Sequence, residues 1–230
     1  STAAVLVDGV APSVTSINRV TSASTNATSV DYTVTFAENV TGVDASDFAL
    51  TATGTAAGTI TSVTQVNGST YTVTVNSISG DGTMRLDLNA SGTGIADAPG
   101  NAITAGYTSG QTYSFDHTAP AAASVGVPAN ATYIAGDNLD FTVNFGEAVT
   151  VNTGGGTPRI AITLDTGGTV YADYISGSGT SALTFRYTVA SGNLDTNGIA
   201  VGALGGNGGT LKDAAGNDAT LTLNSVGSTA

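Results

Sequence analysis

The sequence contains no cysteine and no tryptophan, and it has a single histidine. Without cysteine, neither disulfide bonds nor thiol chemistry can operate. The lone histidine, His117, is too few for a zinc pair or a histidine-based triad, and no Gly-x-Ser-x-Gly motif accompanies it. We therefore expect no catalytic residues and no enzyme activity. The absence of tryptophan makes a carbohydrate-binding module the weaker choice among binding functions.

Charged residues are few, and most of them are acidic. Only 10% of the residues are charged, and 17 acids against five bases give a formal net charge of −12. This balance argues against nucleic acid or an anionic membrane as a partner, and it leaves cations as the natural ligands. No stretch is typical of a signal peptide or a transmembrane helix. We expect no membrane insertion, and we expect any secretion signal to lie elsewhere in a longer protein.

The residues that are abundant favour strands and turns. Threonine, serine, asparagine and 31 glycines must form most of the polar surface, whereas the glutamate, lysine and arginine of exposed helices are scarce. Helix is therefore expected to be a minor component.

Three landmarks occur twice along the chain, in the same order and at similar spacing. They are a junction that ends in Ala-Pro, an alternating strand that ends in Phe-x-Glu, and an Asp-Ala-x-Gly-Asn loop. The copies are 8–12 and 116–120, 32–38 and 141–147, and 97–101 and 213–217. The repetition indicates two homologous domains that join at Asp116.

Apolar residues within each half alternate with polar ones, as in Val30, Tyr32, Val34 and Phe36. Side chains of a strand point to opposite faces in turn, so each such run buries one face. The predicted strands of the first half are 13–21, 30–36, 48–52, 59–66, 70–76, 83–88 and 111–115. Those of the second half are 121–127, 138–145, 158–165, 168–175, 181–190 and 199–203, with a weaker one at 219–224.

Short strands punctuated by glycine and asparagine are typical of a β-sandwich. The fold class predicted is all-β, with two tandem immunoglobulin-like β-sandwich domains. We place domain 1 at 8–115 and domain 2 at 116–230, and we interpret residues 1–7 as the last strand of a preceding repeat.

With these motifs, the chain resembles the tandem immunoglobulin-like repeats of large RTX-type surface adhesins, which bacteria export by type I secretion. The matching elements are the Asp-x-x-Ala-Pro junctions, the Phe-x-Glu strand ends, the Asp-Ala-x-Gly-Asn loops, and the segments 41–48 and 135–141. The similarity covers nearly the whole chain. It implies an extracellular, cell-surface location, an extender or biofilm-adhesin function, and calcium at the domain junctions.

The order of strands in a sandwich leads to a related prediction. The entering linker and the loops after the second, fourth and sixth main strands all lie at one end of an antiparallel sandwich. In domain 1 this end should collect Asp8, Glu38, Asp44, Asp47, Asp97 and Asn101, and in domain 2 Asp116, Glu147, Asp213 and Asn217. Clustered carboxylates repel one another unless a cation intervenes, and oxygen ligands from several loops suit Ca²⁺.

The predicted calcium ligands are accordingly Asp8, Glu38 and Asp97 in domain 1, and Asp116, Glu147 and Asp213 in domain 2. Asp81, from the opposite end of domain 1, is added as a residue that reaches the second site. A simpler interpretation stays open, because aspartate and asparagine are common turn residues that bond their own backbone. Each Asp-Ala-x-Gly-Asn loop could be a tight turn and nothing more.

Two functions remain as hypotheses. The first is a non-catalytic extender or adhesion module of a bacterial surface adhesin, stiffened by calcium where its domains join. The second is an immunoglobulin-like module that itself binds a glycan or a protein of a host or matrix. Partners expected for the first are the neighbouring repeats of the same chain. A third class, an accessory domain of a hydrolase, would need a catalytic domain beside it.

A last prediction concerns self-association. Residues 4–7 precede Asp8 just as residues 112–115 precede Asp116. We therefore expect 4–7 of one molecule to complete domain 2 of a neighbour, head to tail, unless 219–224 serves as the last strand.

Overall fold

A computed structural model of the chain describes residues 7–223. Two compact units divide the chain, Ser1–His117 and Thr118–Ala230, and each is described by itself. Within the described range, no helix is long and apolar enough to cross a membrane.

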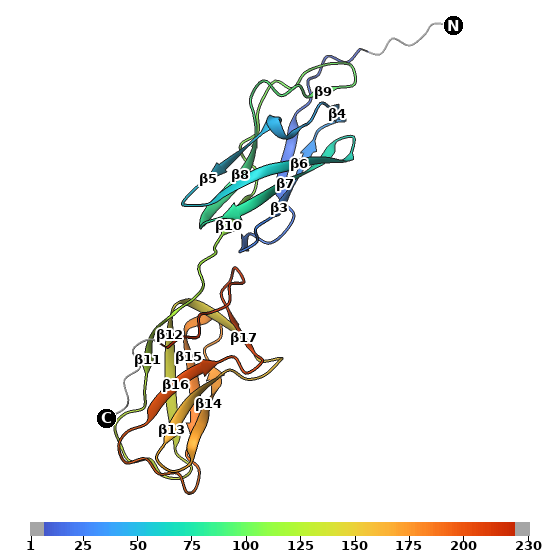
Figure 1. Cartoon of the computed structure of the whole chain (residues 1–230). Helices are drawn as coiled ribbons and strands as arrows, with labels where there is room; N and C mark the ends of the chain where they lie inside the picture. Colours follow the sequence, from blue (N-terminus) through green and yellow to red (C-terminus); the bar gives the residue numbers. More distant parts are fainter. Residues whose placement is uncertain (1–6, 224–230) are drawn as a thin grey trace. The chain divides into compact units, whose positions relative to one another are not determined.

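Unit 1 is a sandwich of two four-stranded sheets (Figure 1). The first sheet has the order β1-β3-β7-β6 and the second the order β2-β10-β8-β5. Two short strands, β4 and β9, form a separate pair, and a 3₁₀ turn, η1, precedes β5. The bounds are β1 Val14–Arg19, β2 Ser24–Thr25, β3 Val30–Phe36, β4 Val40–Thr41, η1 Ala45–Asp47, β5 Phe48–Ala52, β6 Ala57–Asn67, β7 Thr70–Ser79, β8 Gly82–Leu88, β9 Ala96–Asp97 and β10 Thr112–Phe115.

This order of strands is that of an immunoglobulin-like domain. The first, second, fifth and fourth main strands form one sheet, while the third, sixth and seventh form the other. The short β2 joins the second sheet by pairing in parallel with β10, the last strand. The core between the sheets comes from alternating positions, as β3 shows by burying Val30, Tyr32, Val34 and Phe36.

Unit 2 has counterparts of the first six main strands of unit 1, but these strands are joined into sheets differently. They form one curved sheet of order β11-β12-β15-β14-β13-β16, and β17 pairs with the end of β12. Because β13 and β14 also pair as a hairpin, the two layers that are separate in unit 1 are joined here. The bounds are β11 Ala122–Gly126, β12 Asn138–Asn152, β13 Arg159–Leu164, β14 Gly168–Ser176, β15 Thr180–Thr188, β16 Ala200–Gly205 and β17 Thr210–Lys212.

The predicted fold class is confirmed. Thirteen of the predicted strands are also confirmed, twelve of them within a few residues at both ends, while β12 continues seven residues beyond its predicted end at 145. The structure adds the short strands β2, β4, β9 and β17, which are too brief to show an alternating pattern. The weaker strand at 219–224 is wrong over its described part. There Thr220 makes only a parallel bridge to Ala121, while Asn224 lies outside the described residues. Of the predicted strand 4–7, only Val7 is described, and it is in no strand.

Tyr113 of β10 fastens the last strand of unit 1 to the rest of the sandwich. Its ring is fully buried and packs edge-on against Tyr32 at 5.2 Å. Its hydroxyl accepts hydrogen bonds from the backbone N–H groups of Val20 (3.1 Å) and Thr21 (3.2 Å), and it donates one to the carbonyl of Asp31 (3.0 Å). One oxygen therefore satisfies backbone groups that belong to the opposite layer.

Replacing Tyr113 by phenylalanine should lower the free energy of unfolding of unit 1 by about 1–3 kcal/mol, because the partly buried N–H of Thr21 would lose the hydroxyl that accepts its hydrogen bond. The N–H of Val20 and the carbonyl of Asp31 would keep only their bond to each other. Urea denaturation followed by tyrosine fluorescence measures this change. Tyr133→Phe is the matched control, since the Tyr133 hydroxyl bonds one exposed carbonyl, that of Ala129. Equal losses in the two variants would show that the Tyr113 hydroxyl has no special role.

Candidate metal centre

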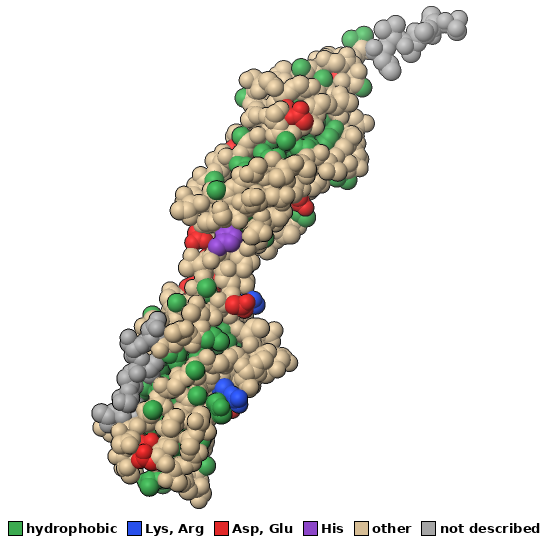
Figure 2. Space-filling view, viewed as in Figure 1, with side chains coloured by type: hydrophobic (Ala, Val, Ile, Leu, Met, Phe, Trp, Pro, Cys, Tyr) green, Lys and Arg blue, Asp and Glu red, His purple; other side chains and the backbone are tan. Residues whose placement is uncertain are grey.

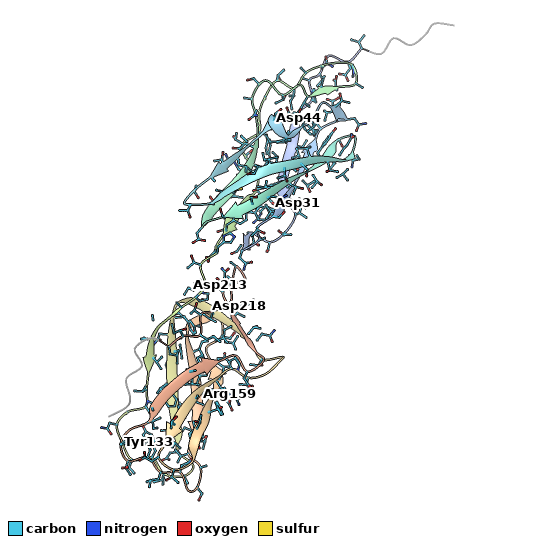
Figure 3. The ribbon with its side chains drawn as sticks, viewed as in Figure 1. Asp31, Asp44, Tyr133, Arg159, Asp213 and Asp218 are labelled. Atoms are coloured by element: carbon cyan, nitrogen blue, oxygen red, sulfur yellow. The ribbon has the colours of Figure 1, made fainter. Side chains whose placement is uncertain are left out.

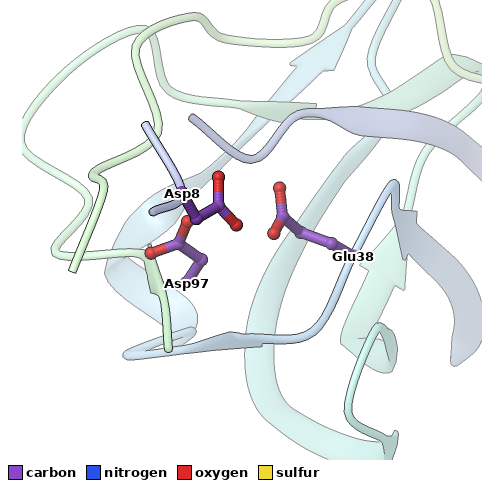
Figure 4. Close-up of side chains that lie close together, drawn as sticks. All are labelled: Asp8, Glu38 and Asp97. Atoms are coloured by element: carbon purple, nitrogen blue, oxygen red, sulfur yellow. The ribbon is translucent and has the colours of Figure 1, made fainter. Parts of the chain in front are cut away.

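Three carboxylates of unit 1 meet at the end of the sandwich where the chain enters (Figure 4). Another acid of the same unit, Asp44, is labelled in Figure 3. Asp8 comes from the entering segment, Glu38 from the turn between β3 and β4, and Asp97 from the end of β9. One oxygen from each lies within 4.8 Å of the others. Figure 4 shows the three side chains converging from three separate segments.

The loop after β9 holds Asp97 in place. Its Oδ1 accepts hydrogen bonds from the backbone N–H groups of Gly100 (2.8 Å) and Asn101 (2.7 Å), and its Oδ2 accepts one from the Asn101 side chain (2.8 Å). Gly100 has φ +99°, a conformation that favours glycine. The Asn101 amide also reaches the carbonyl of Asp8 at 3.2 Å, so this loop positions the entering segment as well.

The pKa values of Asp97 and Glu38 are shifted in opposite directions. Burial alone would raise the pKa of Asp97, but the hydrogen bonds from Asn101 and Gly100 outweigh it and hold that pKa below its usual range. The pKa of Glu38 is raised by desolvation and by the nearby charges of Asp97 and Asp8. Asp97 is thus kept ionised by its own loop, and its charge disfavours ionisation of Glu38.

A corresponding group in the second half consists of Asp116, Glu147 and Asp213, again with one oxygen from each within 4.8 Å of the others. The Asp213 loop repeats the bonds of the Asp97 loop. Oδ1 accepts from the N–H groups of Gly216 (2.6 Å) and Asn217 (2.8 Å), and Oδ2 from the Asn217 side chain (2.8 Å). Gly216 has φ +103°. The predicted tight turn and the predicted carboxylate cluster are therefore the same feature.

Among the described residues, the remaining predicted acids are not in these groups. Asp47 accepts a hydrogen bond from the N–H of Asp44 (2.7 Å), while Asp44 accepts one from the N–H of Ser46 (2.8 Å), so the two acids cap η1. Asp81 accepts a hydrogen bond from the N–H of His117 at 2.6 Å. The short spacing from Asp44 to Asp47 is a capping pattern, and the sequence interpretation missed it.

One polar cluster had no counterpart in the sequence interpretation. Asp87 on β8 is buried, and it binds Arg85 Nε at 2.6 Å and the Thr51 hydroxyl at 2.6 Å. An acid and a base two positions apart on a strand share one face, which is the signal that could have revealed the pair. The partners explain Asp87 without a ligand.

No family model matches the chain, and no curated protein matches it. Among solved structures, the chain is similar to the Escherichia coli adhesin FdeC, with 13% identity and a TM-score of 0.43 over 92% of this chain and 64% of that one. It is also similar to the S-layer protein rSbsC(31–844), with 17% identity and a TM-score of 0.32 over 92% of this chain and 34% of that one. This chain therefore spans less than two thirds of either protein.

Replacing Glu38 by glutamine should raise the melting temperature of unit 1 in chelator at pH 7. The raised pKa of Glu38 means that its ionised form opposes folding. This cost appears only as the pH rises past the ordinary pKa of glutamate. The gain should therefore vanish near pH 3, about one unit below the ordinary glutamate pKa. Scanning calorimetry at several pH values measures it.

The control is Asp44→Asn, for which the opposite sign is expected. Hydrogen bonds from Ser46 lower the pKa of Asp44, so its charge favours folding at pH 7. If Glu38→Gln also lowered the melting temperature in chelator, mutual repulsion within the group would be refuted.

Proposed function

We propose that this chain is a non-catalytic extender and adhesion module of an RTX-type bacterial surface adhesin, and that Ca²⁺ bound by each carboxylate group stiffens the segment that enters each sandwich. The observation that carries the proposal is the recurrence of one arrangement. In both halves an aspartate of the entering segment, a glutamate after the second main strand and an aspartate of the Asp-Ala-x-Gly-Asn loop come together.

Repulsion explains why such a group calls for a cation. Three carboxylates with oxygens within 4.8 Å of one another cannot all ionise at low cost without a positive charge among them. The Asp97 loop nevertheless keeps its carboxylate charged, with three hydrogen bonds. A bound cation would attract all three carboxylates, so the net interaction within the group would change from repulsion to attraction. The group would then hold the entering segment against the loops of the sandwich.

The donor set favours calcium over other metals. All three side chains offer carboxylate oxygens, and the chain has no thiol, so zinc and copper are disfavoured. Ca²⁺ accepts six to eight oxygen ligands in a flexible geometry, whereas Mg²⁺ demands a near-ideal octahedron. Loops from separate segments suit the more tolerant ion, with backbone carbonyls and water completing its shell.

The position of the groups supports an extender function. Each contains one ligand from the segment that enters a sandwich, Asp8 or Asp116, and two ligands from loops of that sandwich. A cation held by such a group ties the entering segment to the end of the fold. Repeated along an array, this would convert flexible connections into stiff ones, as a spacer needs. The sequence resemblance to tandem adhesin repeats agrees with this use.

Calcium titration by calorimetry should show two sites in the parent chain and one site in the Asp8→Asn variant. At free calcium about ten times Kd, each site should add about 1.4 kcal/mol to the free energy of unfolding. Asp44→Asn is the matched control, because it removes one charge from the same unit outside the group and should keep both sites. Absence of calcium binding in the parent chain would refute the proposal.

Small-angle X-ray scattering should reveal the stiffening directly. With calcium, the maximum dimension should become better defined than in chelator, because the segment around Asp116 loses freedom. Asp116→Asn should abolish this response, whereas Asp8→Asn should preserve it. Identical curves with calcium and with chelator would contradict stiffening even if calcium binds.

A further inference from the structure

The outward face of the unit 2 sheet carries a row of four charged residues. The row crosses four neighbouring strands, β12, β15, β14 and β13 (Figure 1). Cross-strand pairs link its members in the order Asp140, Arg186, Asp173 and Arg159. All four side chains point away from the core, because a neighbour of each along its strand is buried. Negative and positive charges therefore alternate along the row.

The sandwich itself does not require these charges, because unit 1 folds without them. The repeated segments place Asp31 of unit 1 in correspondence with Asp140. Across from Asp31 on the next two strands are Thr74 and Ser62, whose side chains are uncharged. The Thr74 hydroxyl donates a hydrogen bond to Asp31 at 2.7 Å, and in unit 2 Arg186 takes its place. The chain has only five basic residues, yet two of them lie in this row.

The charges of the row are accessible to a partner. Arg186 binds Asp140 through Nε and one terminal nitrogen, both at 2.6 Å, so these bonds use only part of its five N–H groups. The two side chains are 39% and 43% exposed. The Arg159 guanidinium, labelled in Figure 3, lies over the Tyr171 ring with Cζ 3.8 Å from its centre. Tyr171 is itself 42% exposed, so this contact holds the Arg159 charge at the surface.

An alternating row of even length is complementary to its own reverse. If a second copy faces the row in reverse order, Asp140 of each copy faces Arg159 of the other, and Arg186 faces Asp173. A two-fold axis parallel to the strands produces this reversal. An axis across the strands would instead place each charge opposite itself, which is repulsive. A partner with charges of one sign would meet as many like charges as unlike ones, so the partner that fits is another copy of this chain.

The packing rules of β-sheets allow such a pair. Two sheets that pack face to face keep their mean strand directions within about 30° of each other. A two-fold axis parallel to the strands meets this condition, since the strands of both copies then run in the same direction. Apolar surface accompanies the charges, because Tyr171 and Ile175 lie on β14 on either side of Asp173 and are 42% and 45% exposed.

We propose that unit 2 pairs with unit 2 of a second copy through this charged row, with the two sheets face to face and their strands in the same direction. The same surface of each copy meets the other, so the association closes as a side-by-side dimer. Four ion pairs form across it, two between Asp140 and Arg159 and two between Arg186 and Asp173. This polarity suits molecules that project together from one surface. The contact uses neither carboxylate group, so it is independent of calcium.

Sedimentation velocity in chelator tests the pairing with two charge reversals, Asp140→Arg and Arg159→Asp. Each should weaken dimerisation by about tenfold or more, because like charges then meet at two places in the dimer. An equimolar mixture of the two variants should dimerise as the parent chain does. In the mixed dimer the two reversed charges face each other, and so do the unchanged Asp140 and Arg159.

The control is Asp31→Arg, which makes the same charge change as Asp140→Arg at the corresponding place of unit 1. It should dimerise as the parent chain does. Two outcomes would overturn the proposal: a parent chain that stays monomeric up to about 1 mM, or a mixture that associates no more than the single variants do.

Pulsed EPR tests the orientation and needs no charge reversal. The chain has no cysteine, so one nitroxide can be attached at Asn138→Cys or, in a second variant, at Asn144→Cys. Both positions lie on the outward side of β12, one before and one after Asp140. Strands that run in the same direction predict similar distances between the two labels of a dimer in both variants. Clearly unequal distances, or no intermolecular distance in a dimeric sample, would overturn the proposal.

Discussion

The two-residue period of the β-strand is the constraint on which this structure depends. Each strand has one apolar face, and the sandwich is stable only when every such face is covered. In unit 1 two sheets cover each other, and Tyr113 fastens the last strand across the layers. In unit 2 six strands curl into one sheet, because the β13–β14 hairpin joins the two layers. The same rule thus accounts for the two separate sheets of unit 1 and for the single continuous sheet of unit 2.

The alternation of strands also decides where charge gathers. Successive antiparallel strands return the chain to the same end of the sandwich, so residues far apart in sequence, such as Glu38 and Asp97, become neighbours. The Asp-Ala-x-Gly-Asn turn then fixes one carboxylate by bonding it three times to its own loop. The hydrogen bonds that stabilise this turn also keep Asp97 charged, and that charge raises the pKa of Glu38. Figure 2 shows acidic side chains in small groups on the visible face of the described residues.

Much of the fold could be predicted from the sequence because burial alternates where the apolar residues alternate. The run from Val30 to Phe36 gives both its bounds and its inward face directly. Strands of two residues, such as β2 and β9, carry no periodicity and depend on tertiary pairing, so they escaped prediction. The same holds for the extension of β12 to Asn152, which is specified by its pairing with β17.

The candidate site was predictable to a similar degree. Internal repetition singled out the three acids of each half, and the structure brings each trio together. What the sequence could not separate were nearby acids with local functions. Asp44 and Asp47 lie close along the chain to Glu38, yet they cap η1, because a short turn satisfies them before they can reach the cluster. Whether these two acids cap a turn or join the carboxylate group depends on the local backbone conformation, which composition does not reveal.

The pairing of β2 with β10 has a mechanical consequence. These strands run parallel near opposite termini of the unit 1 fold, with Ser24 beside Ser114 and Thr25 beside Phe115. Tension applied to the two ends of the unit would pull the strands along their length in opposite directions, so their bonds would be sheared together and not peeled apart in turn. Resistance to tension is governed by the barrier to unfolding and not by equilibrium stability. A domain of modest thermodynamic stability can therefore hold under load for as long as this small shear patch stays intact.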